Sequence, residues 1–342
     1  MDRKMRFGLV GAGVISSHHA KAIAGNPRAE IVAVCDSMMN KAAAIAVEYN
    51  ITSVYDDYEQ MLKRDDIDVI NICLPSGMHA DFAVAAAQAG KHILCEKPLD
   101  ITKPNMERMI TEARSRNVKL GVIYQRRTFP AAIAARKMIQ EGKLGKMVLG
   151  DAYLKYYRSP EYYKSAGWRG TWALDGGGAL MNQGVHGIDL IQWMMGDIQS
   201  VFAYSAALVR DIEVEDTAVA VVKYKNGAFG VIQGATSVNP GQETRFELHG
   251  NDGTIIFDDQ GIKHWSVNGV EQAAPEVEAT ASASNDPANI SSNGHYILID
   301  DMIQAIIDDR DPMVTGEEAK KAVDVILAIY ESAREGKEIV LA

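Results

Sequence analysis

The chain has 342 residues, of which 47% are hydrophobic and 23% charged, and a formal net charge of −10 at pH 7. These values are typical of a soluble globular protein of about two domains, and they exclude a disordered chain, a fibre and a small disulfide-stabilised scaffold. The acidic charge also disfavours a nucleic acid partner, because phosphate backbones bind to basic surfaces.

The cysteines and the N-terminal residues indicate a reducing compartment. Cys35, Cys73 and Cys95 each close a short apolar run, as buried thiols do more often than disulfides. The first apolar residues lead directly into a glycine-rich turn rather than a cleavage site, so we expect no signal peptide. No stretch approaches the about 20 apolar residues that a membrane helix requires. We therefore expect a cytoplasmic protein with no membrane partner.

The first third of the chain alternates short apolar runs with longer amphipathic segments. The runs are rich in Val, Ile and Leu, which is typical of strands buried on both faces. They lie at 6–10, 31–35, 69–74, 91–95 and 119–123, and helical patterns at 38–49, 79–89 and 103–116 separate them. This alternation predicts a parallel sheet with right-handed crossovers, an α/β fold of the Rossmann type.

From about residue 144 the pattern changes to that of an α+β domain. We expect a long strand at 148–157, a loop at 158–178 and a helix at 180–195, followed by successive strands at 200–209, 217–224, 229–235, 244–249 and 254–257. Asn226-Gly227 separates two of these runs and predicts a tight hairpin, so the open sheet should be mostly antiparallel. A loop at 273–292 and two helices at 295–309 and 316–335 complete the chain.

These patterns predict two domains. Residues 1–123 should form the dinucleotide-binding domain, and residues 124–342 should bind substrate and form the oligomer interface. The closing helices are the exception, since they are candidates to pack back on the first domain.

The turn after the first strand resembles a dinucleotide fingerprint. Gly11 permits the tight turn, Gly13 lets the backbone approach a pyrophosphate at the helix N-terminus, and Ser16 replaces the third glycine. Asp36 ends the second strand, 25 residues beyond Gly11, where its carboxylate can accept hydrogen bonds from ribose hydroxyls. Asp36 would repel a 2′-phosphate, and no arginine follows at 37–40, so NAD is favoured over NADP. The alternative is an ordinary glycine turn with a solvated aspartate.

Further motifs make the chain resemble the glucose-fructose oxidoreductase/inositol dehydrogenase/MocA (Gfo/Idh/MocA) family over nearly its whole length. They are the Cys-Glu-Lys-Pro run at 95–98, the segments 74–79 and 124–127, the glycine run 176–178 with Asn182, His-Gly-Ile-Asp at 186–189, and the tail from His295 through Ala305-Ile306 to Tyr330. The resemblance implies a Rossmann domain followed by an α+β domain. It also implies an NAD-dependent oxidoreductase acting on CH–OH groups.

The resemblance also assigns roles to individual residues. Lys97 is implied to be catalytic or orienting, His186 to be the acid/base, and Glu96 and Lys97 to lie near the nicotinamide ribose. Asn182 stands where inositol dehydrogenases often carry Asp, and it can orient a hydroxyl but cannot act as a base. The residues expected to bind the cofactor are Gly11, Gly13, Val14, Ile15, Asp36, Ser37, Leu74, Pro75, Ser76, His79, Glu96, Lys97 and Gln125.

The chemistry of alcohol oxidation fits these residues. A base near neutrality removes the hydroxyl proton, which suits His186, and an ammonium such as Lys97 stabilises the developing alkoxide. Asn182, His186 and Asp189 are spaced to share one helix face. Asp189 is either a site residue or a residue that fixes the helix. The neighbouring His18 and His19 are expected on a helix surface or packed near the cofactor.

Aromatic and arginine side chains are dense between residues 153 and 172. Aromatic rings pack on the C–H faces of sugars, and arginine can hold hydroxyls or a carboxylate, so Arg158, Trp168, Arg169, Asn182, His186 and Lys97 are the expected substrate ligands. The tyrosines of the strand could equally form sheet surface or a subunit interface. No metal-ligand spacing and no hydrolase elbow is visible, so no metal site is expected.

We therefore expect an NAD-dependent dehydrogenase that holds a sugar, glycoside, sugar acid or cyclitol in a cleft between its domains and oxidises a secondary hydroxyl. The 3-hydroxyl is one candidate. Alternatives are a glycosidase that retains NAD, a nucleotide-sugar 3-dehydrogenase and a non-catalytic sensor, although Lys97 and His186 weigh against a sensor. The open sheet is expected to form a homodimer or homotetramer.

Overall fold

The computed structural model describes residues 3–277, 279, 282–287 and 291–341. The chain forms two compact units, Met1–Gln125 with Ser291–Lys320, and Arg126–Ile290 with Lys321–Ala342. The first unit is thus completed by a segment from near the end of the chain. Among the described residues, no helix is both long and apolar enough to cross a membrane.

The first unit is built on a six-stranded sheet in the order β3-β2-β1-β4-β5-β6, and neighbouring strands are parallel. The strands are β1 (Met5–Val10), β2 (Ala29–Cys35), β3 (Val54–Tyr55), β4 (Val69–Ile72), β5 (His92–Cys95) and β6 (Leu120–Val122). All four residues of β4 are buried, as expected for a central parallel strand. The predicted Rossmann-type sheet is confirmed, although β3 was not anticipated because it has only two residues.

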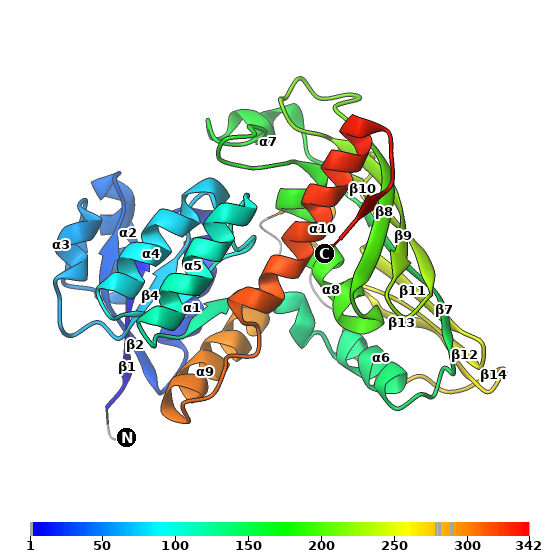
Figure 1. Cartoon of the computed structure of the whole chain (residues 1–342). Helices are drawn as coiled ribbons and strands as arrows, with labels where there is room; N and C mark the ends of the chain where they lie inside the picture. Colours follow the sequence, from blue (N-terminus) through cyan, green and yellow to red (C-terminus); the bar gives the residue numbers. More distant parts are fainter. Residues whose placement is uncertain (1–2, 278, 280–281, 288–290, 342) are drawn as a thin grey trace. The chain divides into compact units, whose positions relative to one another are not determined.

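Helices connect these strands (Figure 1). They are α1 (Val14–Ala24), α2 (Met39–Tyr49), α3 (Tyr58–Leu62), η1 (Ser76–Met78), α4 (His79–Gln88) and α5 (Lys103–Ser115), with η2 (Gln125–Thr128) following β6 and α9 (Asn293–Ile307) coming from the later segment. The strand order reverses at β1 and β4. In open α/β sheets, ligands bind outside the carboxyl ends of the strands at such a point. The turns after β1, β4 and β5 are therefore where a cofactor site is expected.

The second unit is built on a nine-stranded sheet in the order β14-β13-β12-β11-β7-β10-β9-β8-β15. Its strands are β7 (Met147–Lys155), β8 (Ile198–Ala206), β9 (Thr217–Tyr224), β10 (Phe229–Ala235), β11 (Arg245–Gly250), β12 (Gly253–Asp258), β13 (Gly261–Val267), β14 (Val270–Glu271) and β15 (Ile339–Val340). All neighbouring pairs are antiparallel except β7 and β10. The predicted, mostly antiparallel open sheet is confirmed, and β13–β15 extend it at both edges.

The helices of the second unit differ from the expectation in three places. The predicted helix at 180–195 is a π-helical segment, η3 (Ala179–Gly184), followed by α8 (Val185–Met195). The predicted loop at 158–178 contains α7 (Pro160–Lys164), which Ser159 caps. The helix α6 (Pro130–Gln140) was not anticipated. Figure 1 shows α6 and α8 beside the sheet, and α8 packs on β7. The last helix, α10 (Gly316–Glu335), continues from the first unit into the second.

A buried ion pair fixes α8 within the second unit. Arg127 donates two hydrogen bonds to the carboxylate of Asp189, at 2.8 and 2.6 Å, and both side chains are buried. Such a bidentate pair is geometrically specific. Of the two roles considered for Asp189, this contact favours the one that fixes the helix.

Candidate active site

The glycine turn after β1 has the backbone geometry that a dinucleotide requires. Gly11 has a φ of +89°, and a Cβ at this position would lie 2.4 Å from the carbonyl oxygen of Cys73. Around Gly13, by contrast, a Cβ would meet no atom within 4 Å. Helix α1 begins at Val14 and has no side-chain cap, so its first N–H groups can bind an anion. These features fit the pyrophosphate of NAD.

Asp36 connects the ends of β1 and β2. Its carboxylate accepts hydrogen bonds from the backbone N–H groups of Ala12 and Met38, each at 2.7 Å. The carboxylate is thus fixed beside the glycine turn, and Ser37 follows it on the surface. This is the position that the sequence predicts for a ribose-binding acid.

His79 joins the turns after β4 and β5. The imidazole is buried, with Nδ1 2.8 Å from the carbonyl oxygen of Pro98 and Nε2 2.9 Å from that of Leu74. Ser76 is buried in the same turn, and Gln125 is buried directly after β6. Hence these predicted cofactor residues lie at the carboxyl edge of one sheet, next to Glu96 and Lys97.

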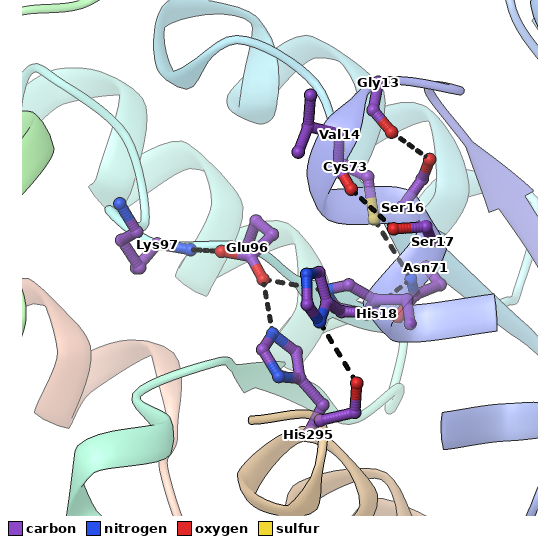
Figure 2. A network of polar contacts seen from close by, with 12 residues as sticks. Gly13, Val14, Ser16, Ser17, His18, Asn71, Cys73, Glu96, Lys97 and His295 are labelled. Carbon is purple, nitrogen blue, oxygen red and sulfur yellow. Dashed lines mark hydrogen bonds and ion pairs between the residues drawn. The ribbon is translucent and has the colours of Figure 1, made fainter. Parts of the chain in front are cut away.

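Glu96 is a buried carboxylate held by imidazoles from two helices. Its Oε1 lies 2.6 Å from Nε2 of His19 and 3.4 Å from Nε2 of His295, while Oε2 accepts the backbone N–H of Lys97 at 3.1 Å (Figure 2). Burial alone would raise the pKa of Glu96, but the two imidazoles hold it well below its usual value. Burial in turn lowers the pKa of His19.

Sequence reasoning missed this cluster. His19 is fully buried rather than on the surface of α1, and the sequence predicts no functional role for His295, which only begins a predicted helix. The family fingerprint identifies Glu96 and Lys97 but says nothing of histidines that lie 77 residues away in one direction and about 200 in the other. The described residues contain two groups of three ligating side chains whose ligand atoms lie within 4.8 Å: His19, Glu96 and His295, and Asp151, Glu247 and His249. The absence of a metal site stays a prediction.

In the second unit, a buried carboxylate holds the glycine run. Glu215 accepts hydrogen bonds from the N–H groups of Gly178 at 3.0 Å and Leu180 at 2.7 Å, and from the Tyr330 hydroxyl at 2.8 Å. A Cβ on Gly177 would lie 2.1 Å from that hydroxyl oxygen. The glycines therefore allow the chain to pass close to Tyr330 before η3 begins.

Asn182 and His186 lie on the segment that Glu215 anchors. The amide nitrogen of Asn182 donates to Asp175, and its oxygen accepts from Gln183 at 2.9 Å. Asp175 is buried and also accepts the N–H of Gly170 at 2.8 Å. A carboxylate thus lies beside Asn182 although residue 182 itself is not acidic. His186 is 9% exposed, in the first turn of α8.

The predicted substrate ligands before the glycine run divide into two kinds. Arg158 is buried and donates to Gln183 and to the carbonyl groups of Tyr157, Ala283 and Ser284. Arg158 therefore holds nearby segments of the same polypeptide in place. Its contact with substrate stays a prediction. Arg169 lies over the rings of Tyr162 and Trp168, at 4.2 and 4.7 Å from their centroids. Arg169 and Trp168 remain half-buried, as a surface for sugar rings requires.

We predict that Glu215 makes the stability of the protein pH-dependent. Burial raises its pKa to about 7, from a usual value of 4.5, despite the hydrogen bonds that oppose this shift. The unfolded chain loses the proton near pH 4.5 and the folded protein near pH 7, so the free energy of unfolding should fall as the pH rises through this window. In Glu215→Gln this decrease, about 3 kcal/mol, should be absent.

Urea unfolding of the wild type and Glu215→Gln at several pH values between 4.5 and 8 tests this prediction. Glu213→Gln, which removes an exposed carboxylate two residues away, serves as the matched control. Parallel pH dependences for the wild type and Glu215→Gln would show that Glu215 does not titrate in this range.

Comparisons with known proteins agree with this geometry. Residues 5–124 match the model "Oxidoreductase family, NAD-binding Rossmann fold", and residues 132–256 match the "GFO/IDH/MocA C-terminal domain". Inositol 2-dehydrogenase of Rhizobium meliloti is 31% identical over 264 residues, 75% of this chain and 76% of its own length. Levoglucosan dehydrogenase of Pseudarthrobacter phenanthrenivorans is 27% identical over 75% of this chain and 74% of its own.

Among solved structures, the WlbA dehydrogenase from Bordetella pertussis in complex with NADH and UDP-GlcNAcA is 33% identical and superposes with a TM-score of 0.89 over 99% of both chains. The expected fold, NAD-binding domain and dehydrogenase class are thereby confirmed. The chain belongs to the Gfo/Idh/MocA family of NAD-dependent oxidoreductases.

Proposed function

We propose that the protein oxidises a secondary hydroxyl of a sugar, glycoside, sugar acid or cyclitol, with Lys97 and His186 acting on the reacting oxygen. The supporting observation is the position of Lys97. It lies two residues after the end of β5, at the carboxyl edge of the sheet that carries the glycine turn and Asp36, and Glu96 accepts a hydrogen bond from its backbone N–H. Bound NAD supplies the acceptor for the hydride that leaves the carbon.

The chain's own residues handle the proton and the charge on oxygen. In this proposal the His186 imidazole removes the hydroxyl proton, and the Lys97 ammonium stabilises the alkoxide that develops. Asn182, held by Asp175 and Gln183, orients the hydroxyl without taking its proton. The products are then the ketone, NADH and a proton.

The relatives suggest two classes of substrate. Enzymes named for inositol and levoglucosan favour a free cyclitol or sugar. A nucleotide-linked sugar acid is the second candidate, because the structure that is 33% identical was solved with UDP-GlcNAcA. The half-buried Arg169, Trp168 and Tyr162 could pack against a sugar ring in either case.

Absorbance at 340 nm tests the proposed reaction directly. The purified protein is mixed with NAD and a panel of inositols, hexoses, anhydrosugars, glycosides, uronic acids and UDP-linked sugars. NADH should accumulate with one class, and Lys97→Ala and His186→Ala should each reduce kcat by about 100-fold or more. Lys103→Ala, an exposed lysine at the start of α5, is the control and should retain activity.

Two outcomes would contradict the proposal. Full activity in either site variant would remove that residue from the mechanism. Release of free sugar from a glycoside without net NADH would instead indicate the alternative glycosidase, in which the cofactor is regenerated in each cycle.

Asp36 should determine the preference for NAD over NADP. Asp36→Asn keeps an acceptor for the Ala12 N–H but removes the negative charge that would repel a 2′-phosphate. We expect the ratio of the Kd values for NADP and NAD to fall by about tenfold, as measured by calorimetric titration. Asp56→Asn removes an exposed charge after the adjacent β3 and should leave the ratio unchanged. An unchanged ratio in Asp36→Asn would show that another feature excludes the phosphate.

We also propose that the open face of the second sheet forms the subunit interface of a homo-oligomer. Tyr204, Val219, Val221 and Phe229 are 74, 43, 54 and 58% exposed, and strand pairing places them on one face. Contiguous apolar patches of this kind mark interfaces. Val221→Lys should therefore reduce the particle mass measured by light scattering. An identical mass for wild type and variant would contradict this interface.

A further inference from the structure

The Glu96 cluster draws together elements that are distant along the chain. His19 comes from α1, Glu96 follows β5, and His295 lies in the first turn of α9. Asn71, in β4, completes the set, because its amide nitrogen lies 2.9 Å from Nδ1 of His19. The side chains of His19 and His295 are fully buried, and that of Glu96 is 6% exposed. A charged carboxylate in such a place must be held by neighbouring donors.

The hydrogen bonds connect Asn71, His19, Glu96 and the backbone of Lys97, and both His19 and Lys97 donate to the carboxylate of Glu96. With Nδ1 of His19 accepting from Asn71, its Nε2 carries the proton and donates to Oε1 of Glu96. The other carboxylate oxygen, Oε2, accepts the backbone N–H of Lys97 (Figure 2). The hydrogen bond from His19 and the contact of His295 at 3.4 Å thus limit the orientation of the carboxylate, and the carboxylate limits the orientation of the peptide that carries the lysine.

We propose that His19 and His295 are positioning residues that act through Glu96 to hold Lys97 in its working orientation. This inference rests on the proposed catalytic role of Lys97. It assigns to the two histidines a part in the reaction step rather than in cofactor affinity. His19 shares helix α1 with the cofactor turn, so the two effects have to be separated by experiment.

A bound metal ion explains the cluster less well. Zinc holds His and Glu ligands at about 2.0–2.2 Å, which places neighbouring ligand atoms about 3.3 Å apart. The Nε2 of His19 and Oε1 of Glu96 are 2.6 Å apart, the separation of a direct hydrogen bond to a charged acceptor. His295 is different, because within the described part of the chain neither of its ring nitrogens has a hydrogen-bond partner. Its Nε2 lies 3.4 Å from Oε1 of Glu96.

Matched substitutions separate positioning from folding. His19→Leu removes the donor to Glu96, whereas His19→Gln can place an amide N–H near the position of Nε2. Lys21→Gln changes an exposed residue of the same helix and serves as the control. His295→Leu is a second, independent removal in case His19→Leu does not fold. Thermal melting establishes that each variant is folded before it is assayed.

We expect kcat, with the substrate identified in the panel, to fall by about 100-fold in His19→Leu, since a misplaced catalytic group costs about this much. The Kd for NAD should change by less than about threefold. His19→Gln should recover kcat to within about tenfold of the wild type, and His295→Leu should reproduce the kcat loss. Wild-type kcat in both Leu variants, or a loss confined to NAD affinity, would overturn the proposal.

A second measurement does not depend on turnover. Reductive ¹³C-methylation labels the lysines, and Lys97→Arg identifies the NMR signal of Lys97. This signal should move in His19→Leu and His295→Leu and stay in place in Lys21→Gln. An unmoved signal overturns the positioning role even if the enzyme is active. If the wild type oxidises no substrate, the proposed function fails, while a moved signal still supports the link to Lys97.

Zinc titration followed by elemental analysis covers the remaining alternative. One equivalent of zinc bound by the wild type and lost in His295→Leu would overturn the proposal and make the cluster a metal site. Absence of stoichiometric zinc supports the hydrogen-bonded arrangement.

Discussion

Carboxylates that accept backbone N–H groups hold the functional turns of this protein, and two of the three, Glu96 and Glu215, are buried. Asp36 accepts from Ala12 and Met38, Glu96 from Lys97, and Glu215 from Gly178 and Leu180. Turns and helix starts leave N–H groups that no regular element satisfies, and a charged acceptor satisfies them with strong, directional bonds. Each of these carboxylates therefore fixes the backbone of a turn that is assigned to the cofactor or to the reaction.

The sequence predicts the architecture well because the relevant signals are local. Apolar runs of five or six residues indicate the parallel strands of the first unit, and the glycines and Asp36 mark the cofactor edge. In the second unit, the Asn226-Gly227 turn between two strand-like runs predicts the antiparallel pairing of β9 and β10. Short elements such as β3, β14 and β15 have two residues each and carry too little pattern to be found.

The parts of the site that the sequence does not predict are set by contacts between distant segments. In the sequence, His19 is only one position on an amphipathic helix. Its contacts with Glu96, after β5, and with His295, in α9, form only in the folded protein. Asp175 and Glu215 are unremarkable acids in the sequence, and only folding brings them to Asn182 and to the glycine run. The π-helical start of the segment carrying Asn182 is not predicted either, because π-helical turns are rare and occur mostly as single turns within α-helices.

The return of residues 291–320 to the first unit has a consequence for synthesis on the ribosome. Lys97 and Glu96 emerge early, but His295 follows about 200 residues later, which is roughly 10–40 seconds at ordinary elongation rates. During that interval the carboxylate of Glu96 lacks one of its two imidazoles, and α1 lacks the helix α9 that packs on it. The nascent first unit thus reaches its finished lysine-bearing edge only when nearly the whole chain has been made, and a truncated product would not carry it.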